Sequence, residues 1–294
     1  MDKSITVYIP THNRPDFLRR ALSSLSKQSY KKFQVGVCDD GSSLENSSEN
    51  RLIVDEYRNK FDDIFLIRNP HPKGACFARN AVIKRADGNY ITGLDDDDEF
   101  TSERIQCFVD SWDEKYAYLS SGHITFDGKY NTLSSMYLGK ETNLKELLFK
   151  NTVGNQIFTL KSRMLSLNGF DEKLPSWQDY DMWVRLTKMY GAGFKVNAHT
   201  YILNIGHELN RITTSNKAKL GADMFITKHS SIINTYQLHS LRLQDLINRS
   251  ADMSLKFFVK NNDMYNFIPM IKYIIHHNYP NTAYLIKKIL KRID

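Results

Sequence analysis

Four adjacent aspartates followed by a glutamate, Asp95–Glu99, are the strongest chemical signal in the sequence. Neighbouring carboxylates repel one another, so such a run is unfavourable unless solvent or a cation screens it. Mg2+ and Mn2+ prefer carboxylate oxygens, and they bind diphosphates through the same coordination sphere. The run therefore predicts a metal site. A solvated acidic loop at the start of a helix is the alternative, because carboxylates also suit the helix dipole.

Two further polar segments could contact a phosphorylated nucleotide. Asp39 and Asp40 precede a glycine and a serine, and their carboxylates could accept hydrogen bonds from a base N–H or from ribose hydroxyls. An ordinary aspartate turn is the alternative. In Gly74–Asn80 the glycine allows close backbone approach and Arg79 could meet a phosphate, unless Arg79 is only a structural ion-pair partner.

An aromatic and acidic segment, Trp177-Gln-Asp-Tyr-Asp181, begins a predicted helix. An aspartate there normally caps the helix, and a tryptophan normally packs. A sugar site nevertheless needs an apolar ring for the hexose face and a carboxylate base for its hydroxyl. We therefore expect Asp179 to act as the base, and Trp177 and Gln178 to contact the acceptor.

Alternating strand and helix signals in the first hundred residues predict the elements that position these groups. They imply an α/β fold, with a parallel sheet covered by helices on both faces. Ligands bind beyond the carboxyl ends of such strands, so Thr11-His12-Asn13, Asp39-Asp40 and Asp95–Asp98 should gather at one rim. The predicted strands are Ile5–Ile9, Phe33–Cys38, Ile64–Ile67 and Tyr90–Leu94. One predicted helix starts at Pro15, and two others cover Leu52–Phe61 and Lys73–Ala86.

The alternation weakens after residue 100, and the chain reads as mostly helical from Asn216. We expect a catalytic domain over residues 1–215, with a nucleotide-sugar half at about 1–100 and an acceptor half at about 101–215. Residues 216–294 form a helical C-terminal extension. Within residues 101–215, the patterns predict helices at Thr101–Lys115, Asn143–Lys150 and Ser176–Met189, and strands at Tyr116–Phe126 and Val153–Leu160.

Composition narrows the class of protein. The 294 residues are 41% hydrophobic and 25% charged, as is usual for a soluble globular protein. The net charge is +7, but no nucleic-acid-binding motif is visible, so no nucleic acid is expected as a partner. Three widely spaced cysteines indicate reduced thiols. No signal peptide or membrane span is visible, so the chain is expected to be cytoplasmic, soluble or peripheral.

Taken together, the segments resemble glycosyltransferase family 2 on the GT-A fold, which joins a Rossmann-like nucleotide-binding sheet to helices on both faces. Each segment is modest, but their order and spacing make the match specific, and it covers about residues 4 to 215. The matching segments are Val7–Asn13, Val37–Ser42, Gly74–Asn80, Tyr90–Glu99, Gly169–Glu172 and Gln178–Leu186.

The resemblance implies roles for individual residues. Thr11 and Asp39 would contact the uracil and ribose, Arg79 would lie near the base or pyrophosphate, and Asp95 would hold the ribose side. Asp97 would coordinate Mn2+ or Mg2+, with Asp98 adjacent and His207 near the metal or pyrophosphate. Asp179 would be the general base. The residues expected to bind the nucleotide sugar are Thr11, Asn13, Asp39, Asp40, Arg79, Asp95 and Asp96.

Two positions depart from the family pattern. Gln178 stands where glutamate is usual, so the acidic pair before the helix is reduced to Asp179. Asp96 stands where a small residue is usual, which leaves open which aspartates contact the ion.

The implied activity is metal-dependent hexosyl transfer from a UDP-sugar, with UDP-glucose and UDP-galactose as the guesses. The metal neutralises the departing pyrophosphate, Asp179 deprotonates the acceptor hydroxyl, and a single displacement turns an α-linked donor into a β-linked product. The acceptor is expected to be a lipid-diphosphate-linked sugar of a bacterial surface polysaccharide, either the O-antigen of lipopolysaccharide or a capsule.

Two other functions compete with this interpretation. A sugar-phosphate nucleotidyltransferase would carry a glycine-rich basic loop after the first strand, where this chain has Pro10–Pro15. It would also release pyrophosphate. A sugar- or cation-binding module would keep the polar clusters and lack turnover.

The C-terminus carries two apolar stripes and a basic face. The stripes could pack on the catalytic domain, or they could bring the chain to the inner surface of the cytoplasmic membrane, where basic residues attract anionic lipids. The first stripe is Phe267, Ile268, Ile271, Ile274 and Ile275, the second is Ile286, Ile289, Leu290 and Ile293, and the basic residues are Lys287, Lys288, Lys291 and Arg292.

Overall fold

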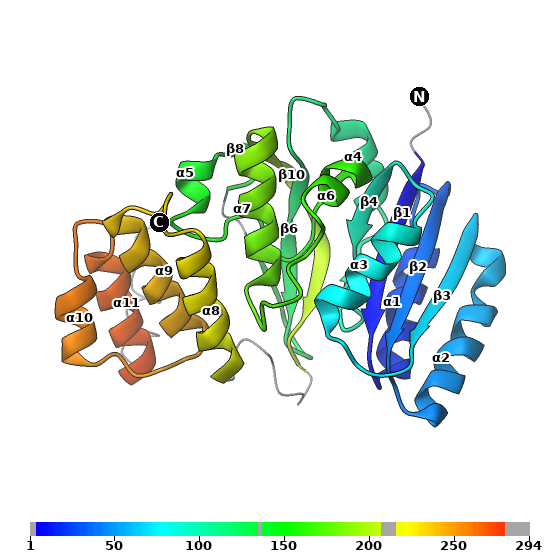
Figure 1. The fold of residues 1–294 in the computed structure, drawn as a ribbon, viewed down its shortest axis with the longest axis horizontal. Coiled ribbons are helices and arrows are strands. Elements are labelled where there is room, and N and C mark those ends of the chain that lie inside the picture. Colours follow the sequence, from blue (N-terminus) through cyan, green and yellow to red (C-terminus); the bar gives the residue numbers. More distant parts are fainter. Residues whose placement is uncertain (1–3, 135–136, 207–215, 280–294) are drawn as a thin grey trace. The chain divides into compact units, whose positions relative to one another are not determined.

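The computed structural model describes residues 4–134, 137–206 and 216–279 (Figure 1). These residues form two compact units. The larger unit lies within residues 4–206, and the helical unit consists of residues 216–279 with two short pieces, 148–150 and 174–177. The predicted domain boundary at residue 215 falls among residues outside the described part, and the two short pieces have no counterpart in the sequence-based division.

The larger unit is built on one sheet with the strand order β3-β2-β1-β4-β9-β6-β10-β5, in which β7 pairs with β6 and β8 with β10. The strands are β1 (Ile5–Thr11), β2 (Phe33–Asp40), β3 (Asp63–Asn69), β4 (Tyr90–Gly93), β5 (Glu99–Phe100), β6 (Leu119–Phe126), β7 (Asn131–Leu133), β8 (Lys140–Thr142), β9 (Phe158–Leu160) and β10 (Gly193–Asn204).

The first four strands are mutually parallel, as predicted. In the other half of the sheet β9 runs antiparallel to β4 and β6, while β10 is parallel to β6. The sheet is therefore mixed, and the α/β prediction is confirmed, with β1 to β4 forming an all-parallel part. Because the carboxyl ends of β1, β2 and β4 share one edge, the polar segments that follow them meet there.

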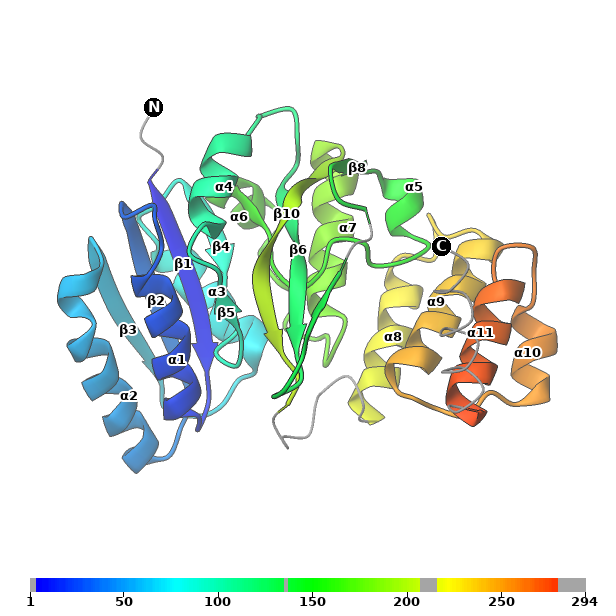
Figure 2. The same cartoon turned by 180° about the vertical axis from the view of Figure 1, so that it is seen from behind.

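Helices cover both faces of the parallel half. These are α1 (Pro15–Ser26), α2 (Leu44–Glu56) and α3 (Ala75–Arg85), with a short 3-10 helix at Arg58–Lys60. Figures 1 and 2 show α1 on one face of β1 and β2, and α3 on the other. Every residue of β1 and β2 is buried, as expected for parallel strands covered on both sides.

Pro15 occupies the first turn of α1, as predicted, but the helix expected at Leu52–Phe61 was misplaced. The observed α2 begins after Ser43, whose side chain accepts a hydrogen bond from the backbone N–H of Asn46. Such a serine cap supplies a partner for one of the free N–H groups of the first turn, and it starts the helix eight residues earlier than the apolar pattern suggested.

The remaining helices of the larger unit are α4 (Arg104–Ser111), α5 (Leu144–Leu147), α6 (Lys161–Ser166) and α7 (Gln178–Tyr190). Trp183 and Leu186 of α7 are buried, whereas Met189 near its end is 65% exposed. The twelve-residue strand β10 was not predicted. Lys195 and Thr200 lie buried in it, so its residues lack the apolar alternation that marks a strand.

The helical unit contains α8 (Asn216–Lys228), α9 (Thr235–Asn248), α10 (Leu255–Asn261) and α11 (Phe267–Asn278), which confirms the helical prediction for the described part of this region. Ser176 anchors its short piece by donating a hydrogen bond to the backbone carbonyl of Ala218 (3.1 Å). A search of the described helices finds none long and apolar enough to cross a membrane.

Candidate functional site

The four consecutive aspartates after β4 point in different directions. Asp96 and Asp98 are buried, with 1% and 2% exposure. The side chains of Asp95 and Asp97 are 20% and 26% exposed. The chain thus relieves the repulsion expected for this run by directing alternate carboxylates to separate partners.

Asp96 is held on the β1 side of the site. Thr11 donates a hydrogen bond to its Oδ2 (2.7 Å), and a guanidinium nitrogen of Arg14 lies 2.5 Å from its Oδ1. Burial raises the pKa of Asp96 to about 7, and the charge of Arg14 opposes that rise. In this arrangement Thr11 and Asp96 bind each other. Their predicted contacts with a nucleotide stay untested.

Asp98 is held on the β10 side. Tyr201 donates its hydroxyl hydrogen to Oδ2 (2.8 Å), and the backbone N–H of Asn204 donates to Oδ1 (2.9 Å). Burial raises the pKa of Asp98 well above its usual value, and the charges of Asp97 and Asp95 add to the rise. Because both oxygens already have protein donors, the geometry favours Asp97 over Asp98 as a metal ligand.

Asp97 has the most exposed carboxylate of the four aspartates. Its Oδ2 accepts a hydrogen bond from Arg14 (3.3 Å), and its backbone carbonyl accepts one from Arg20 (2.5 Å). The described residues contain no cluster of three His, Cys, Asp or Glu side chains suited to a metal, and His207 lies outside them. Mg2+ commonly takes one or two carboxylates, substrate phosphates and waters, so a partly exposed Asp97 fits such an ion.

Asp39 and Asp40, at the end of β2, were both predicted to bind the nucleotide, but they have different partners in the structure. Asp39 accepts a hydrogen bond from the backbone N–H of Ser42 (3.0 Å), while its buried Oδ2 has no hydrogen-bond partner. Asp40 accepts from Asn69 (2.7 Å) and from the backbone N–H groups of Lys73 and Gly74. Asp40 therefore orders the loop before α3, and the predicted role of Asp39 in nucleotide binding stays untested.

Asn13 joins the loops that follow β1 and β2. Its side-chain oxygen accepts a hydrogen bond from the backbone N–H of Ser43 (2.8 Å), and its own N–H donates to the hydroxyl of Ser42 (2.8 Å). Asn13 has a φ of 55°, a left-handed conformation that asparagine tolerates better than most residues. The structure thus places Asn13 beside the predicted nucleotide segment, where it holds the backbone.

Arg79 of α3 joins the acidic run to the start of α7. Its Nη2 donates to Asp95 Oδ1 (2.7 Å), and its Nη1 donates to Gln178 Oε1 (3.2 Å) and lies 3.4 Å from Asp179 Oδ1. Arg79 is only 6% exposed. Sequence reasoning placed Arg79 and Asp95 with the nucleotide and Asp179 and Gln178 with the acceptor, and the structure brings all four together.

Burial governs the acidity of Asp179. It raises the pKa to about 6, and the positive charge of Arg79 limits the rise. A carboxylate with this pKa is mostly ionised at neutral pH and is a stronger proton acceptor than an ordinary aspartate. This property suits a general base.

Gln156 belongs to the same network and was missed by sequence reasoning. Its Nε2 donates to Asp95 Oδ1 (3.1 Å), and its Oε1 accepts from the Tyr8 hydroxyl (2.9 Å). The only available signal was a polar residue inside the expected strand Val153–Leu160, a segment in which the structure has β9 begin at Phe158.

Trp177 belongs to the helical unit, where its ring packs against Phe225 at a centroid distance of 5.3 Å. This is the packing role that the sequence left open for a tryptophan. The predicted contact of Trp177 with an acceptor sugar stays a prediction.

Comparison with known proteins is consistent with this geometry. The model of Glycosyl transferase family 2 matches residues 6–168. The putative colanic acid biosynthesis glycosyl transferase WcaA of Escherichia coli K12 is 34% identical, over 81% of this chain and 86% of its own length. The E. coli UDP-Glc:α-D-GlcNAc-diphosphoundecaprenol β-1,3-glucosyltransferase WfgD is 26% identical, over 64% of this chain and 71% of its own.

The fold is also shared with a solved structure. TarS residues 1–349 of S. aureus, in complex with UDP, superimpose with a TM-score of 0.63 at 18% identity, covering 93% of this chain and 80% of that one. At this identity the likeness shows the fold alone.

The raised pKa of Asp179 predicts a pH-dependent stability. The folded chain holds the Asp179 proton more tightly than the unfolded chain, so ionising this carboxyl destabilises the fold. The cost is absent below about pH 4 and complete above about pH 6. Asp179→Asn removes it, so the variant should gain stability relative to the native chain as the pH rises from 4 to 7, measured by urea unfolding.

Asp62→Asn, which removes one exposed carboxylate from the same unit, is the matched control. A stability difference between Asp179→Asn and the native chain that stays constant over this pH range would contradict the assignment.

Proposed function

The chain belongs to glycosyltransferase family 2, and we propose that it moves a hexosyl group from a UDP-sugar to a sugar hydroxyl with inversion at the anomeric carbon. The observation that carries the proposal is the Arg79 bridge between Asp95 and Asp179. Asp95 stands at the rim where a nucleotide sugar binds in such sheets, and Asp179 has the properties of a base. One arginine thus holds donor-side and acceptor-side groups together.

The uracil nucleotide is proposed from the rim after β1 and β2. Asp39 keeps a buried oxygen available to accept a hydrogen bond from a base N–H or a ribose hydroxyl. The name of the relative WfgD includes UDP-Glc, and the TarS structure contains UDP. UDP-glucose and UDP-galactose are the donors to try first.

Asp97 is the residue proposed to hold Mn2+ or Mg2+. A divalent ion there would neutralise the charge that develops on the departing diphosphate. Arg14 and Arg20 bind the carboxylate and the carbonyl of Asp97, so they orient this residue toward the same rim.

Asp179 is proposed to remove the proton of the acceptor hydroxyl as that oxygen attacks C1 from the face opposite UDP. Arg79 keeps Asp179 in place and limits the rise of its pKa. Because UDP is displaced from C1 in a single step, an α-linked donor gives a β-linked product. Formation of UDP, rather than pyrophosphate, distinguishes this reaction from nucleotidyl transfer.

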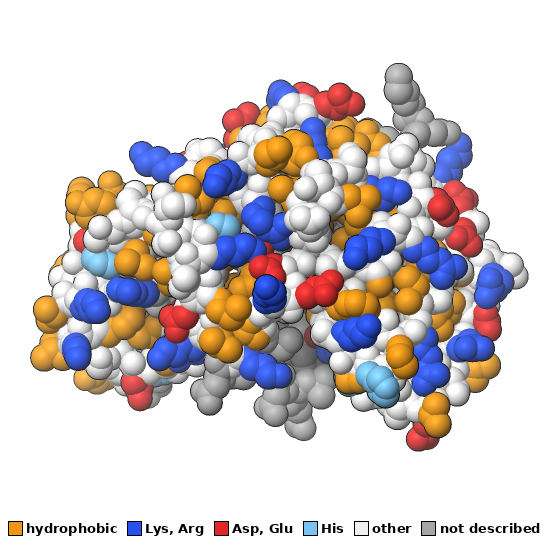
Figure 3. Space-filling view, in the orientation of Figure 1, with side chains coloured by type: hydrophobic (Ala, Val, Ile, Leu, Met, Phe, Trp, Pro, Cys, Tyr) orange, Lys and Arg blue, Asp and Glu red, His pale blue; other side chains and the backbone are white. Residues whose placement is uncertain are grey.

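The acceptor is proposed to be a lipid-diphosphate-linked sugar in surface-polysaccharide synthesis. The relative WcaA is named for colanic acid biosynthesis, and WfgD for an undecaprenol-linked acceptor. In the helical unit, Leu255, Val259 and Ile268 are exposed, as are Lys256 and Lys260. Hydrophobic side chains are visible over the α10 end of that unit in Figure 3. Such surfaces suit contact with an anionic bilayer.

The metal proposal predicts that EDTA abolishes UDP release and that Mn2+ or Mg2+ restores it. Asp97→Ala should lower turnover by at least about 10²-fold and remove the Mn2+-dependent part of UDP binding, as measured by calorimetry. Asp98→Asn is the informative comparison. It should mainly lower the melting temperature, because Tyr201 and Asn204 use both oxygens of Asp98. Full activity in chelator would remove the metal from the mechanism.

The base proposal predicts that Asp179→Asn lowers turnover by about 10²–10⁴-fold while UDP affinity stays nearly the same. The native enzyme should lose kcat/KM as the pH falls through about 6, because protonated Asp179 cannot accept the acceptor proton. Asp62→Asn should leave turnover unchanged. Normal turnover by Asp179→Asn would mean that another group is the base.

The membrane proposal predicts binding to anionic liposomes at low salt and release at high salt. Replacement of Lys287, Lys288, Lys291 and Arg292 by glutamine should abolish this binding and should slow transfer to a lipid-linked acceptor more than to a soluble one. These four residues lie outside the described part of the chain. Equal binding to neutral and anionic liposomes would rule out the charge-based attachment.

A further inference from the structure

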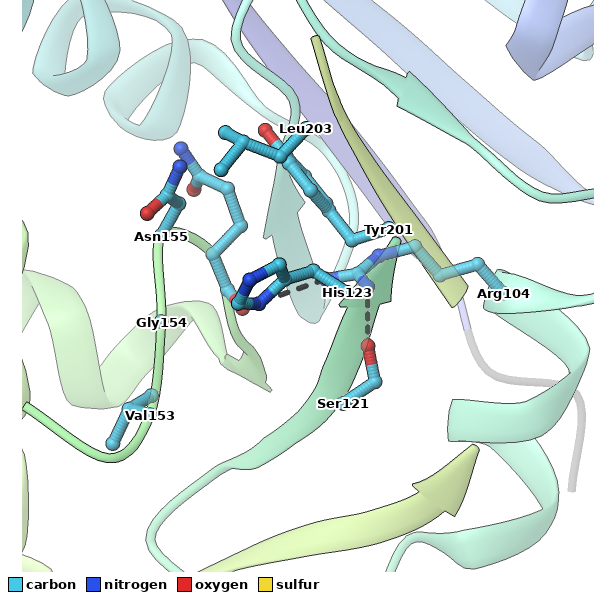
Figure 4. Close-up of a pocket in the computed structure, with 9 residues that line it drawn as sticks. Arg104, Ser121, His123, Val153, Gly154, Asn155, Tyr201 and Leu203 are labelled. Carbon is cyan, nitrogen blue, oxygen red and sulfur yellow. Dashed lines mark hydrogen bonds between the residues drawn. The ribbon is translucent and has the colours of Figure 1, made fainter. Parts of the chain in front are cut away.

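A small pocket opens beside β6 and β10 in the larger unit (Figure 4). We call it the Arg104 pocket. The residues that matter for its chemistry are Arg104, Ser121, His123, Asn155, Gln156 and Tyr201. Its lining contains an arginine and a histidine but no aspartate or glutamate, and its volume is about 20 Å³.

Arg104 lies at the inner end of this pocket with neutral partners. Nη1 donates to the hydroxyls of Ser121 (2.8 Å) and Thr200 (3.0 Å), and Nη2 donates to the backbone carbonyl of Gln156 (3.4 Å). Nε is buried and has no hydrogen-bond partner. Figure 4 shows the side chain reaching from α4 toward Ser121. The guanidinium therefore retains N–H groups for a further acceptor.

Within the described residues, no carboxylate forms an ion pair with Arg104, although this side chain is only 1% exposed. Three aromatic rings surround the guanidinium, those of Phe100, Phe108 and Tyr201, with centroids 4.5–5.0 Å from its carbon. Such contacts offset part of the cost of burying a cation, but an unpaired buried charge is unfavourable. Burial lowers the pKa of Arg104 to about 10, which still leaves it charged at neutral pH.

Two other arginines of the same unit, the buried Arg79 and the partly buried Arg185, show the usual arrangement. Arg79 contacts Asp95 and Asp179, and Arg185 pairs with Asp181 at 2.8 Å. Arg104 differs from both because its charge faces a cavity instead of a carboxylate. The difference suggests that the anion for Arg104 is supplied by a ligand.

We propose that the Arg104 pocket binds the carboxylate of an acidic sugar, a hexuronate, carried either by the donor or by the acceptor. The inference rests on the proposed transferase function and names its substrate class. Arginine matches a carboxylate through paired N–H donors, and the neutral His123 ring can add another. A cavity of about 20 Å³ is far too small for a lipid diphosphate, so any anion that reaches Arg104 must be a small substituent such as a carboxylate.

The position of the pocket relative to the reaction centre supports the proposal. Gln156 is one of the residues that line the pocket, and its side-chain amide donates a hydrogen bond to Asp95 Oδ1 (3.1 Å). Asp95 in turn pairs with Arg79, which reaches Asp179. A sugar bound near Asp95 and Asp179 could therefore place a carboxylate substituent at Arg104.

The test compares acidic and neutral sugars in two arms. The donor arm measures UDP release with UDP-glucuronate and with UDP-glucose, using one acceptor. The acceptor arm uses glucuronate-terminated and glucose-terminated lipid-diphosphate acceptors with one donor. We expect kcat/KM to favour the carboxylated substrate by at least about tenfold in one arm, the size of effect expected when a hydrogen-bonded charge loses its partner.

Two variants connect such a preference to the pocket. Asn155 is exposed at the pocket, so Asn155→Asp should fold normally and introduce a carboxylate that competes for Arg104. It should reduce the acidic-to-neutral ratio at least about tenfold. The same change at exposed Asn59, in the 3-10 helix, should leave the ratio unchanged. Arg104→Met should also remove the preference, provided that its circular dichroism matches the native chain.

Acidic-to-neutral ratios of kcat/KM within about twofold of unity in both arms would overturn the inference. A preference for the acidic sugar that survives Asn155→Asp would also overturn it. Absence of transfer with every pair would instead reject the transferase proposal. In that case binding still decides the inference. UDP-glucuronate or a simple glucuronide should bind more tightly than its glucose counterpart, and Asn155→Asp should remove the difference. Equal affinities would overturn the inference.

Discussion

The ion pairs of Arg79 are the constraint on which the site depends. Its guanidinium is buried, and close partners of opposite charge offset much of the cost of burying a charge. Asp95 arrives after β4 and Asp179 at the start of α7, so satisfying Arg79 fixes the parallel half of the sheet relative to that helix. The same contacts determine where Asp179 stands and keep its pKa from rising further.

The acidic run shows how the fold makes use of an unfavourable sequence. Four neighbouring carboxylates would repel one another in one shared space, but each has donors nearby, and Arg14 contacts both Asp96 and Asp97. Asp96 and Asp98 turn inward to Thr11 and Tyr201, and Asp95 pairs with Arg79. Asp97 remains the most accessible. The run thus supplies structural contacts and a candidate metal ligand together.

Much of this architecture could be predicted from local patterns, and some of it could not. The parallel strands β1 to β4 coincide with apolar runs in the sequence. Their carboxyl ends, and the sheet edge where the polar segments meet, could therefore be predicted. Strand β10 could not be predicted, because its buried residues include the polar Lys195 and Thr200 and so break the apolar alternation of a strand. The start of α2 was misjudged because one hydrogen bond to Ser43 sets it. The roles of Gln156 and Arg104 depend on partners from distant strands, such as Asp95 and Thr200, which no local pattern identifies.

The central claim is a single displacement at C1, assisted by a base held on the acceptor side by Arg79. The most direct measurement is the anomeric configuration of the isolated disaccharide product, determined by NMR after transfer from an α-linked UDP-sugar. The arrangement of Asp95, Arg79 and Asp179 predicts a β linkage. An α-linked product would contradict it, because retention requires a mechanism other than one displacement from the face opposite the leaving group.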